Sequence, residues 1–236
     1  LDYTEQQGRG EVCMGSTQGG EIYAAVIAAV GGGGGELKSS QRLFRSNDGG
    51  LSWTSRSIEL PGGNELTAFT VLNDDSLLVA EGGNLLGDRS CVRIHRSVDR
   101  GETWVQAGMI PAEPFEQIGE GCLSLTQLKD GTILFPVCRW NKVPEGTPNL
   151  FAQYVYRSTD DGRTWQGGGE LKKGNIAPVG NGPASRWPGM GGTFPGCVET
   201  HIVELSDGKL LAVFRYSGDP QPWHRDKVKE WGGSTE

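Results

Sequence analysis

A carboxylate and a guanidinium flank one predicted turn late in the sequence. In the stretch CVETHIVELSDGKLLAVFR, Glu199 precedes and Arg215 closes two alternating runs joined by Asp207–Gly208. Alternation on both sides of an Asp-Gly pair predicts a β-hairpin, which would bring Glu199 and Arg215 close together. An arginine fork can hold a carboxylate through two parallel hydrogen bonds. The two residues therefore suit acid-binding chemistry, and they equally suit a solvated strand end and an ordinary cross-strand ion pair.

Three further clusters combine tryptophan with charged residues. Tryptophan offers a flat apolar face to a sugar ring, and arginine or histidine can hydrogen-bond hydroxyls or acids. Arg139 and Trp140 close a predicted strand in CRWNKVPEG, within one residue of the position that corresponds to Arg215; Trp140 could equally cap its sheet. The loop candidates are Arg186 and Trp187 in PASRWPGMGGTFPG, and Trp223, His224 and Arg225 in RYSGDPQPWHRDKVKEW. His224 beside Asp226 is either an acid–base pair or simply exposed.

One short pattern, S-x-D-x-G-x-[S/T]-W, occurs three times, as SNDGGLSW, SVDRGETW and STDDGRTW. Each copy follows a strand-like run that ends in Arg-Ser, and two runs around a turn lie further upstream. The first serines of the copies are 51 and 61 residues apart. The fixed positions are Ser46, Asp48, Gly50, Trp53, Ser97, Asp99, Gly101, Trp104, Ser158, Asp160, Gly162 and Trp165.

These units predict the architecture that would position the candidate residues. In each unit a turn joins the first two strands, a connection leads to the third strand, and the repeated pattern joins the third strand to the fourth. Four-stranded units at such periods are typical of β-propeller blades. The predicted blades cover residues 11–60, 65–110 and 121–171, with a partial blade at 197–236. About three and a half blades cannot close a ring without leaving sheet edges exposed. We therefore expect an N-terminal portion of a longer propeller; the alternative is a complete small protein that pairs with a second copy.

The repeated pattern has a structural explanation. Its glycine can adopt positive φ in a turn, and its aspartate can accept hydrogen bonds from backbone N–H groups of the same loop. Its tryptophan, at the start of the next strand, can bury its ring between neighbouring sheets. We expect each copy to be a clip that joins the third and fourth strands of a blade.

Composition excludes several classes. The chain of 236 residues has 38 glycines and 12 prolines, which suits short strands and tight turns, and its net charge of −7 argues against non-specific nucleic-acid binding. The longest apolar run, residues 22–30, is too short to span a membrane. The three histidines are not spaced as metal ligands on one element, and the five cysteines include no C-x-x-C pair, so the sequence indicates no metal site. The glycine run from residue 31 lacks the lysine of a phosphate-binding loop, so we expect no cofactor.

The three patterns resemble the Asp-box (BNR) repeats of the sialidase superfamily, and the resemblance covers nearly the whole chain. It implies an all-β fold, a six-bladed β-propeller, and a glycoside hydrolase that cleaves a terminal acidic sugar, with sialic acid as the family default. Its carbohydrate substrate would be a glycan end. Asp boxes also occur in propellers without enzymatic activity, so a non-catalytic carbohydrate-binding or scaffolding propeller is the alternative.

The resemblance also implies roles for individual residues. Glu199 would be the carboxylate that polarises a tyrosine nucleophile, and Arg215 would be one of three arginines that hold the substrate carboxylate. Arg9 is the candidate for the first of these arginines. The tyrosine and the third arginine would belong to later blades.

One departure from the family pattern concerns the general acid. The family places an aspartate in the loop after the first strand pair, whereas the corresponding segment GGGGGELKSS offers only Glu36. Either Glu36 replaces the acid or the chain binds a sugar without cleaving it.

Overall fold

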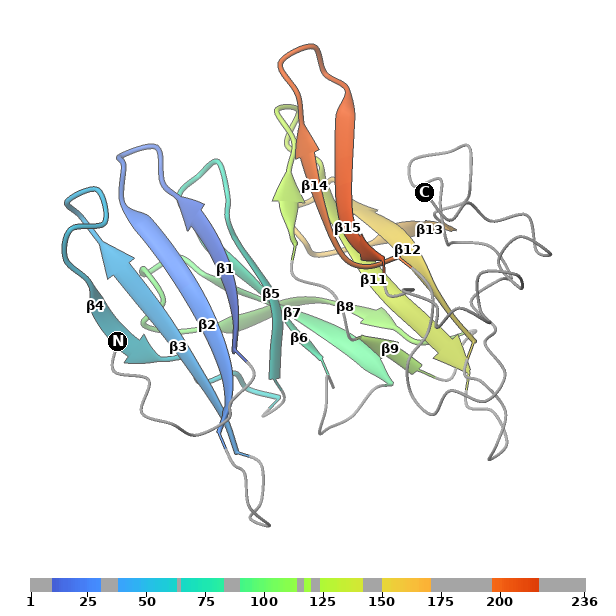
Figure 1. Ribbon diagram of the computed structural model, residues 1–236, viewed down its shortest axis with the longest axis horizontal. Coiled ribbons are helices and arrows are strands. Elements are labelled where there is room, and N and C mark those ends of the chain that lie inside the picture. Colours follow the sequence, from blue (N-terminus) through green and yellow to red (C-terminus); the bar gives the residue numbers. More distant parts are fainter. Residues whose placement is uncertain are drawn as a thin grey trace, which may run out of the picture.

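All the secondary structure described is β-sheet. The computed structural model describes residues 10–30, 38–62, 65–82, 90–113, 117–119, 124–141, 150–170 and 197–216. In these ranges the strands β1 to β15 form three successive sheets and a final two-stranded hairpin, all with antiparallel neighbours (Figure 1). The described ranges hold no helix that could cross a membrane. The prediction of an all-β propeller built from four-stranded units is confirmed.

The first two sheets have the same order of strands. The first contains β1 (Gly10–Ser16), β2 (Ile22–Val30), β3 (Lys38–Ser46) and β4 (Thr54–Ser57). The second contains β5 (Glu65–Val71), β6 (Leu77–Gly82), β7 (Cys91–Ser97) and β8 (Val105–Pro111). In each sheet the strands pair in chain order, and the serine of the repeated pattern closes the third strand. The loop of the pattern therefore joins the third strand to the fourth.

The third sheet differs in its first strand, which is split in two. Its strands are β9 (Gln117–Gly119), β10 (Thr126–Gln127), β11 (Ile133–Asn141), β12 (Leu150–Ser158) and β13 (Gln166–Glu170). Both β9 and β10 pair with β11, β10 near its start and β9 with Cys138 to Trp140. The hairpin of β14 (Cys197–Glu204) and β15 (Leu210–Tyr216) follows.

Hydrogen bonds between successive hairpin turns hold the four units in register. Gln18 donates its backbone N–H to Asp75 Oδ1 at 2.8 Å, and the backbone N–H of Asn73 donates to Gln127 Oε1 at 2.7 Å. The backbone N–H of Lys129 donates to Glu204 Oε2 at 2.7 Å. The turns of all four inner hairpins therefore lie at one end of the molecule, here called the turn end.

The hydrophobic core lies between the sheets because residues on a strand alternate between its two faces. On β6, Leu77 and Val79 pack with residues of the first sheet, whereas Leu78 and Ala80 pack with residues of the third. The second sheet is thus buried on both faces, because it has a sheet on either side. Both faces of its strands therefore carry apolar residues, which explains the nearly continuous apolar run of β6.

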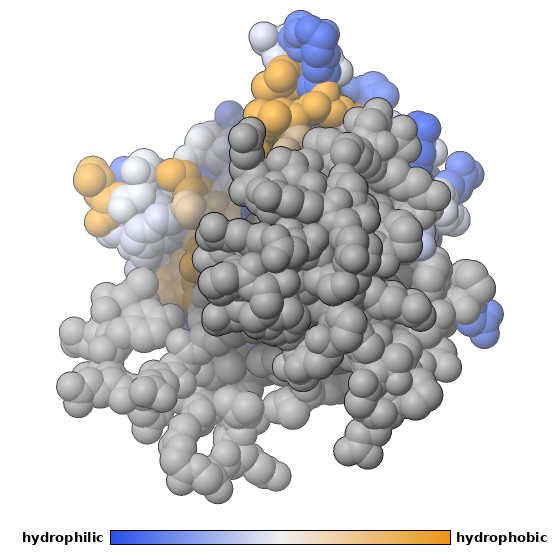
Figure 2. Space-filling model, turned by 45° about the vertical axis from the view of Figure 1, so that its right-hand side comes forward, coloured by the Kyte–Doolittle hydropathy of each residue, from blue (hydrophilic) through white to orange (hydrophobic). Residues whose placement is uncertain are grey.

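The β14–β15 hairpin has a face that no described residue covers. Leu211 pairs with Val203 at the position where Leu78 pairs with Thr70 in the second sheet. Leu78 is fully buried, whereas Leu211 is 47% exposed and Val213 is 60% exposed. Figure 2 shows this apolar surface at the top of the molecule, below the hydrophilic turn of the hairpin.

Candidate functional site

An open cavity of about 420 Å³, here called the central cavity, lies between the inner strands. Its walls come from β1, β5, β14 and β15, together with residues 124–126. Val12 and Met14 of β1 and Val213 of β15 make the lining largely apolar, and His201 and Thr126 add polar groups. The alternation of β1 and β14 could have predicted these lining residues, but the sequence analysis did not single them out.

The candidate residues on described strands lie at the end of this cavity that is opposite the turn end. Glu199 is near the start of β14, and Arg215 is near the end of β15. Arg139 and Trp140 are near the end of β11, where they pair with Ile118 and Gln117 of β9. Strand direction alone brings these backbone positions to the same end of the molecule.

An irregularity in β14 sits at the candidate glutamate. Val198 lies opposite Arg215 and His201 lies opposite Val213, so that Glu199 and Thr200 together face the single residue Phe214. This two-against-one count is a β-bulge, a feature that often re-aims a side chain beside an active site. The hairpin therefore places the backbone of Glu199 next to that of Arg215, as the turn-based expectation required.

The remaining loop candidates lie outside the described residues. They are Arg9, Glu36, Arg186, Trp187, Trp223, His224 and Arg225.

A tyrosine–carboxylate pair does exist among the described residues, but its chemistry does not suit a nucleophile. Tyr23 donates its hydroxyl to Glu21 Oε2 at 2.9 Å, and its ring is buried between the first and second sheets. Burial, and then the hydrogen bond to Glu21, raise the pKa of Tyr23 to about 12. The hydrogen bond from Arg45 lowers the pKa of Glu21. The pair stabilises the neutral phenol, so it is a structural contact.

The three repeated loops share one hydrogen-bond scheme. In the first, the Gly50 N–H donates to Ser46 Oγ at 2.9 Å, and the Ser52 N–H donates to Asp48 Oδ1 at 2.9 Å. The hydrogen bonds from Ser52 hold the pKa of Asp48 at about 2. Thr103 does the same for Asp99, and Thr164 lowers the pKa of Asp160. The aspartate is thus a fixed acceptor that organises its loop.

Burial of the tryptophan varies among the three loops. Trp104 is 9% exposed, and Trp165 packs edge-to-face on Phe135 with ring centroids 5.9 Å apart. Trp53 is 40% exposed, so the expectation that each ring is buried between sheets is wrong for the first loop. The reason is geometric: the second and third loops pack on the preceding sheet, and no described residue precedes the first sheet.

A buried acid–imidazole pair escaped the sequence analysis. Glu81 on β6 contacts His95 Nε2 on β7, and both side chains are fully buried. Alternation along the two strands directs them toward the first sheet, and Gly62 lies directly against the Glu81 carboxylate. Burial lowers the pKa of His95, although the hydrogen bond that its Nε2–H donates to Glu81 opposes that shift. The pair occupies a sheet interface and does not line the central cavity.

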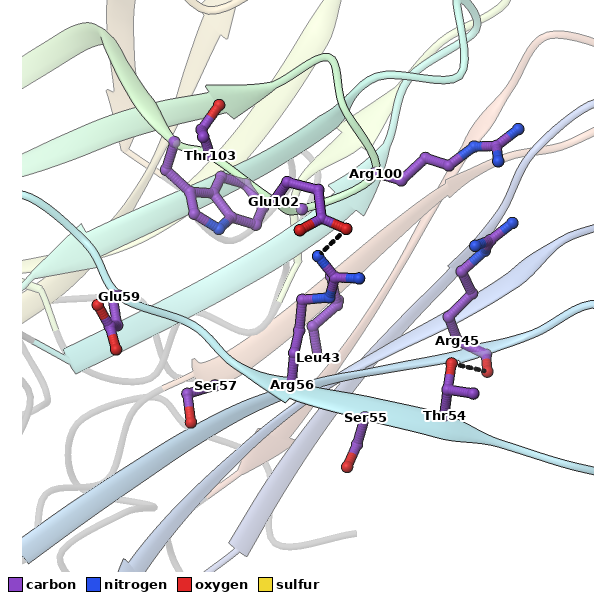
Figure 3. Close-up of a pocket in the computed structure, with 12 residues that line it drawn as sticks. Leu43, Arg45, Thr54, Ser55, Arg56, Ser57, Glu59, Arg100, Glu102 and Thr103 are labelled. Atoms are coloured by element: carbon purple, nitrogen blue, oxygen red, sulfur yellow. Dashed lines mark hydrogen bonds and ion pairs between the residues drawn. The ribbon is translucent and has the colours of Figure 1, made fainter.

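A second cavity, of about 540 Å³, lies between β4 and the second repeated loop (Figure 3). Figure 3 shows Arg56 reaching across it to the carboxylate of Glu102, with which it forms an ion pair. Arg45 and Arg100 extend side by side at its other end (Figure 3). The sequence analysis assigned no role to this groove.

In the described ranges no three histidine, cysteine, aspartate or glutamate side chains gather as a metal site would require.

The chain matches no protein-family model and no curated protein. Among solved structures, a protein of unknown function from Dyadobacter fermentans superposes with a TM-score of 0.61 at 20% identity, covering 92% of this chain and 65% of that one. The Hadza microbial sialidase Hz136 superposes with a TM-score of 0.60 at 17% identity, over 91% of this chain and 43% of that one. An α-L-arabinofuranosidase from Fusarium graminearum, Arb93A, superposes with a TM-score of 0.54 at 14% identity. The match covers 92% of this chain and 58% of that one.

The chain thus spans 43% to 65% of the length of these three proteins. At identities of 14% to 20%, the likeness concerns the fold. The three sheets and the hairpin therefore form part of a sialidase-like β-propeller, a fold that also carries other glycosidases.

Proposed function

We propose that this chain is the N-terminal portion of a sialidase-type glycoside hydrolase, which cleaves a terminal acidic sugar from a glycan. Glu199 acts as the carboxylate partner of a tyrosine nucleophile, and Arg215 binds the carboxylate of the substrate. Arg139, Trp140 and the loop candidates extend the sugar-binding surface. The remaining blades, with the tyrosine and a third arginine, lie in a longer protein.

One observation carries the proposal. The bulge in β14 sets the backbone of Glu199 beside that of Arg215, at one end of the central cavity. A glutamate and an arginine on neighbouring strands suit an acidic sugar, because a guanidinium can hold the sugar's carboxylate and a glutamate can assist proton transfer. The likeness in fold to a sialidase supports the same assignment.

A second function is supported by a different observation. The sequence has no aspartate between Asp2 and Asp48, so the acid implied for the first blade is absent unless Glu36 replaces it. A propeller that lacked its general acid would bind a sugar without hydrolysing it. Non-catalytic carbohydrate binding is therefore the competing assignment.

Hydrolysis of a fluorogenic α-sialoside by the full-length protein distinguishes the two functions. We expect turnover, and we expect Glu199→Gln to lower kcat by about 10² to 10⁴, the usual contribution of a positioned acid or base. Glu204→Gln is the matched control, because Glu204 lies on the same strand at the turn end and accepts a hydrogen bond from Lys129. This control should leave kcat unchanged.

Arg215→Lys separates binding from chemistry. Lysine keeps the charge but loses the two-point fork, so KM should rise more than kcat falls. A folded protein that binds a sialoside without turnover would support the non-catalytic function. A protein that neither binds nor cleaves it, but hydrolyses an arabinofuranoside, would overturn the acidic-sugar assignment.

A further inference from the structure

The second and third repeated loops dock on the preceding sheet in the same way. The glycine of each loop packs on that sheet, Gly101 against Leu43 and Gly162 against Ile94. Leu43 and Ile94 hold equivalent positions, because each lies three residues before the serine of its own pattern. Packing at the glycine therefore offers each loop the same kind of contact on either sheet.

The residues on either side of this glycine are charged, and the two loops carry the charges in reverse order. The fourth and sixth positions of the pattern are Arg100 and Glu102 in the second loop, and Asp161 and Arg163 in the third. The first loop has no charged residue at either position. Arg100 and Asp161 have φ of 63° and 58°, a conformation that disfavours residues other than glycine. A long or charged side chain kept at such a position indicates that the side chain has a role.

Both charges of the second loop meet opposite charges on the first sheet. Glu102 forms an ion pair with Arg56 of β4, and Arg100 Nη2 lies 3.8 Å from Glu21 Oε1 (Figure 3). Arg45, beside Arg100 in Figure 3, also pairs with Glu21. The first sheet thus presents a carboxylate to the fourth position of the loop and a guanidinium to the sixth.

The second sheet presents the opposite charge to the fourth position. Asp161 Oδ2 lies 3.6 Å from Arg96 Nη1, and the Arg96 side chain is 17% exposed. Gly108 stands opposite Ile94 where Arg56 stands opposite Leu43 in the first sheet. Arg163 therefore meets no side chain at that position, and it pairs with Asp161 of its own loop at 3.5 Å. Each loop is complementary in charge to the sheet on which it lies.

Docking on the wrong sheet would bring like charges together. On the first sheet, the third loop would place Asp161 against Glu21. It would also place Arg163 against Arg56. The second loop on the second sheet would bring two arginines together. Like charges in contact are a common means of excluding a wrong partner, and misassembly between similar units is a characteristic failure of repeat proteins.

We propose that the charges at the fourth and sixth positions of the repeated loop select the sheet on which each loop docks, and so fix the order of the units during folding. The glycine supplies packing that the loops share, and the two charges supply the difference between them. This role concerns the assembly of the sheets, so it is independent of the activity proposed above.

Exchanging the charges of the second loop tests the complementarity. Arg100→Asp with Glu102→Arg creates two like-charge contacts on the first sheet. In low salt its unfolding equilibrium constant, from urea unfolding, should be about fivefold that of the neutral variant Arg100→Asn with Glu102→Gln. Asparagine and aspartate both tolerate the positive φ. Adding Arg56→Glu restores one opposite pair and should recover part of the loss, and about 0.5 M NaCl should remove most of the difference.

Refolding tests the ordering itself. Asp161→Arg with Arg163→Glu gives the third loop the charges of the second, so that it fits the first sheet better than its own. On dilution from urea, this variant should yield at least about twofold less native protein than Asp161→Asn with Arg163→Gln. The neutral variant loses the correct contact without favouring the wrong sheet, so it controls for lost stability.

A charge placed elsewhere on a repeated loop provides a second control. Leu51→Glu adds a carboxylate at the sixth position of the first loop, where the side chain is 89% exposed, and should refold as the unmodified chain does. The proposal is overturned if the exchanged and neutral variants of the second loop are equally stable in low salt, or if Arg56→Glu recovers nothing. Equal refolding of the two third-loop variants would also overturn it.

Discussion

The interface between the first and second sheets and that between the second and third use the same architecture with different chemistry. In both, the glycine of a repeated loop packs on the preceding sheet: Gly101 against Leu43, and Gly162 against Leu78 and Ile94. The second–third interface is otherwise apolar and closed by Gly108. The first–second interface holds the buried Glu81–His95 pair and the open groove beside Arg56.

The repeated loop therefore fixes how two sheets meet but not what lies between them. Where a glycine faces the loop, backbones pack against each other and exclude any ligand. Where an arginine faces it, an ion pair with Glu102 replaces that contact and leaves space for one. Specific function can therefore be added at one interface without altering the repeat.

The largest expected effect is on the polar interface. Glu81→Ala leaves the imidazole N–H of His95 buried without its acceptor, which costs about 1–3 kcal/mol of unfolding free energy, and the cavity left by the lost side chain adds to that cost. Urea unfolding of the chain measures this change. Glu102→Ala, which removes the exposed partner of Arg56, should change stability little. Equal losses in the two variants would contradict the contrast between buried and exposed pairs.

The closed interface should be nearly as sensitive to a single methyl group. Gly108→Ala places a Cβ against the backbone carbonyls of Gly162 and Arg163, and relieving such overpacking costs about 2–3 kcal/mol. Arg56→Ala is the matched substitution at the corresponding position of the first sheet, where the groove leaves room. Thermal unfolding of both variants compares the interfaces directly. If Gly108→Ala were neutral, the two sheets would not be in backbone contact.

The two interfaces should also differ in their dependence on pH. Burial lowers the pKa of His95 below its ordinary value of 6.5, so the unfolded chain takes up a proton first as the pH falls. The unfolding free energy should therefore decrease from about pH 7 downward, by at most about 1.4 kcal/mol per pH unit, until the folded-state pKa is reached. Arg93, on the same strand, lowers the pKa further through its charge.

Urea unfolding between pH 7 and pH 5 follows this effect. The double variant Glu81→Leu with His95→Phe removes the imidazole together with its partner and should lose this part of the pH dependence. Phenylalanine is already present at the equivalent position of the first sheet, as Phe44, which supports the choice. If the unfolding free energy of the double variant decreased with falling pH as steeply as that of the unmodified chain, the pH dependence would belong to other groups.

The smallest effect compares two tryptophans. Trp165→Phe removes the indole N–H that donates to Gly162 O and should cost about 1 kcal/mol. Trp104→Phe removes a donor that has no partner in the described part of the chain, so its cost should come from the lost packing of the indole and not from a hydrogen bond. Both changes also lose the packing of the larger indole ring, and chemical denaturation measures the total cost of each. No loss of stability in Trp165→Phe would contradict a contribution from the hydrogen bond to Gly162 O.

Local features of the sequence predicted most of the fold. Alternating runs around Asp-Gly turns predicted the inner hairpins, and the repeated pattern predicted the loops between third and fourth strands, because both depend on neighbouring residues. The split between β9 and β10 was not predicted, since the segment EPFEQIGEGCLS has no alternation to mark it. Arg100 and Asp161 adopt positive φ, which residue type alone did not reveal.

Contacts between sheets were less accessible from the sequence. The exposure of Trp53 depends on which sheet lies beside it, not on its own loop. Glu81 and His95 sit in ordinary strand-like runs, and their pairing requires knowledge of the register of β6 on β7. For the candidate site, the Asp207–Gly208 turn predicted that Glu199 and Arg215 would be close. The bulge that puts two residues opposite Phe214 depends on hydrogen bonding that the sequence does not display.

The hydrogen bonds that tie together the hairpin turns have a consequence for how such a protein can change. Gln18, Gln127 and Glu204 anchor one turn to the next, so an insertion at that end would disturb several units at once. The connections at the opposite end differ in length: the segment 171–196 has 26 residues and the segment 83–89 has seven. New specificities can therefore be introduced in the connections at that end, while the hydrogen-bonded turns at the turn end keep the sheets aligned.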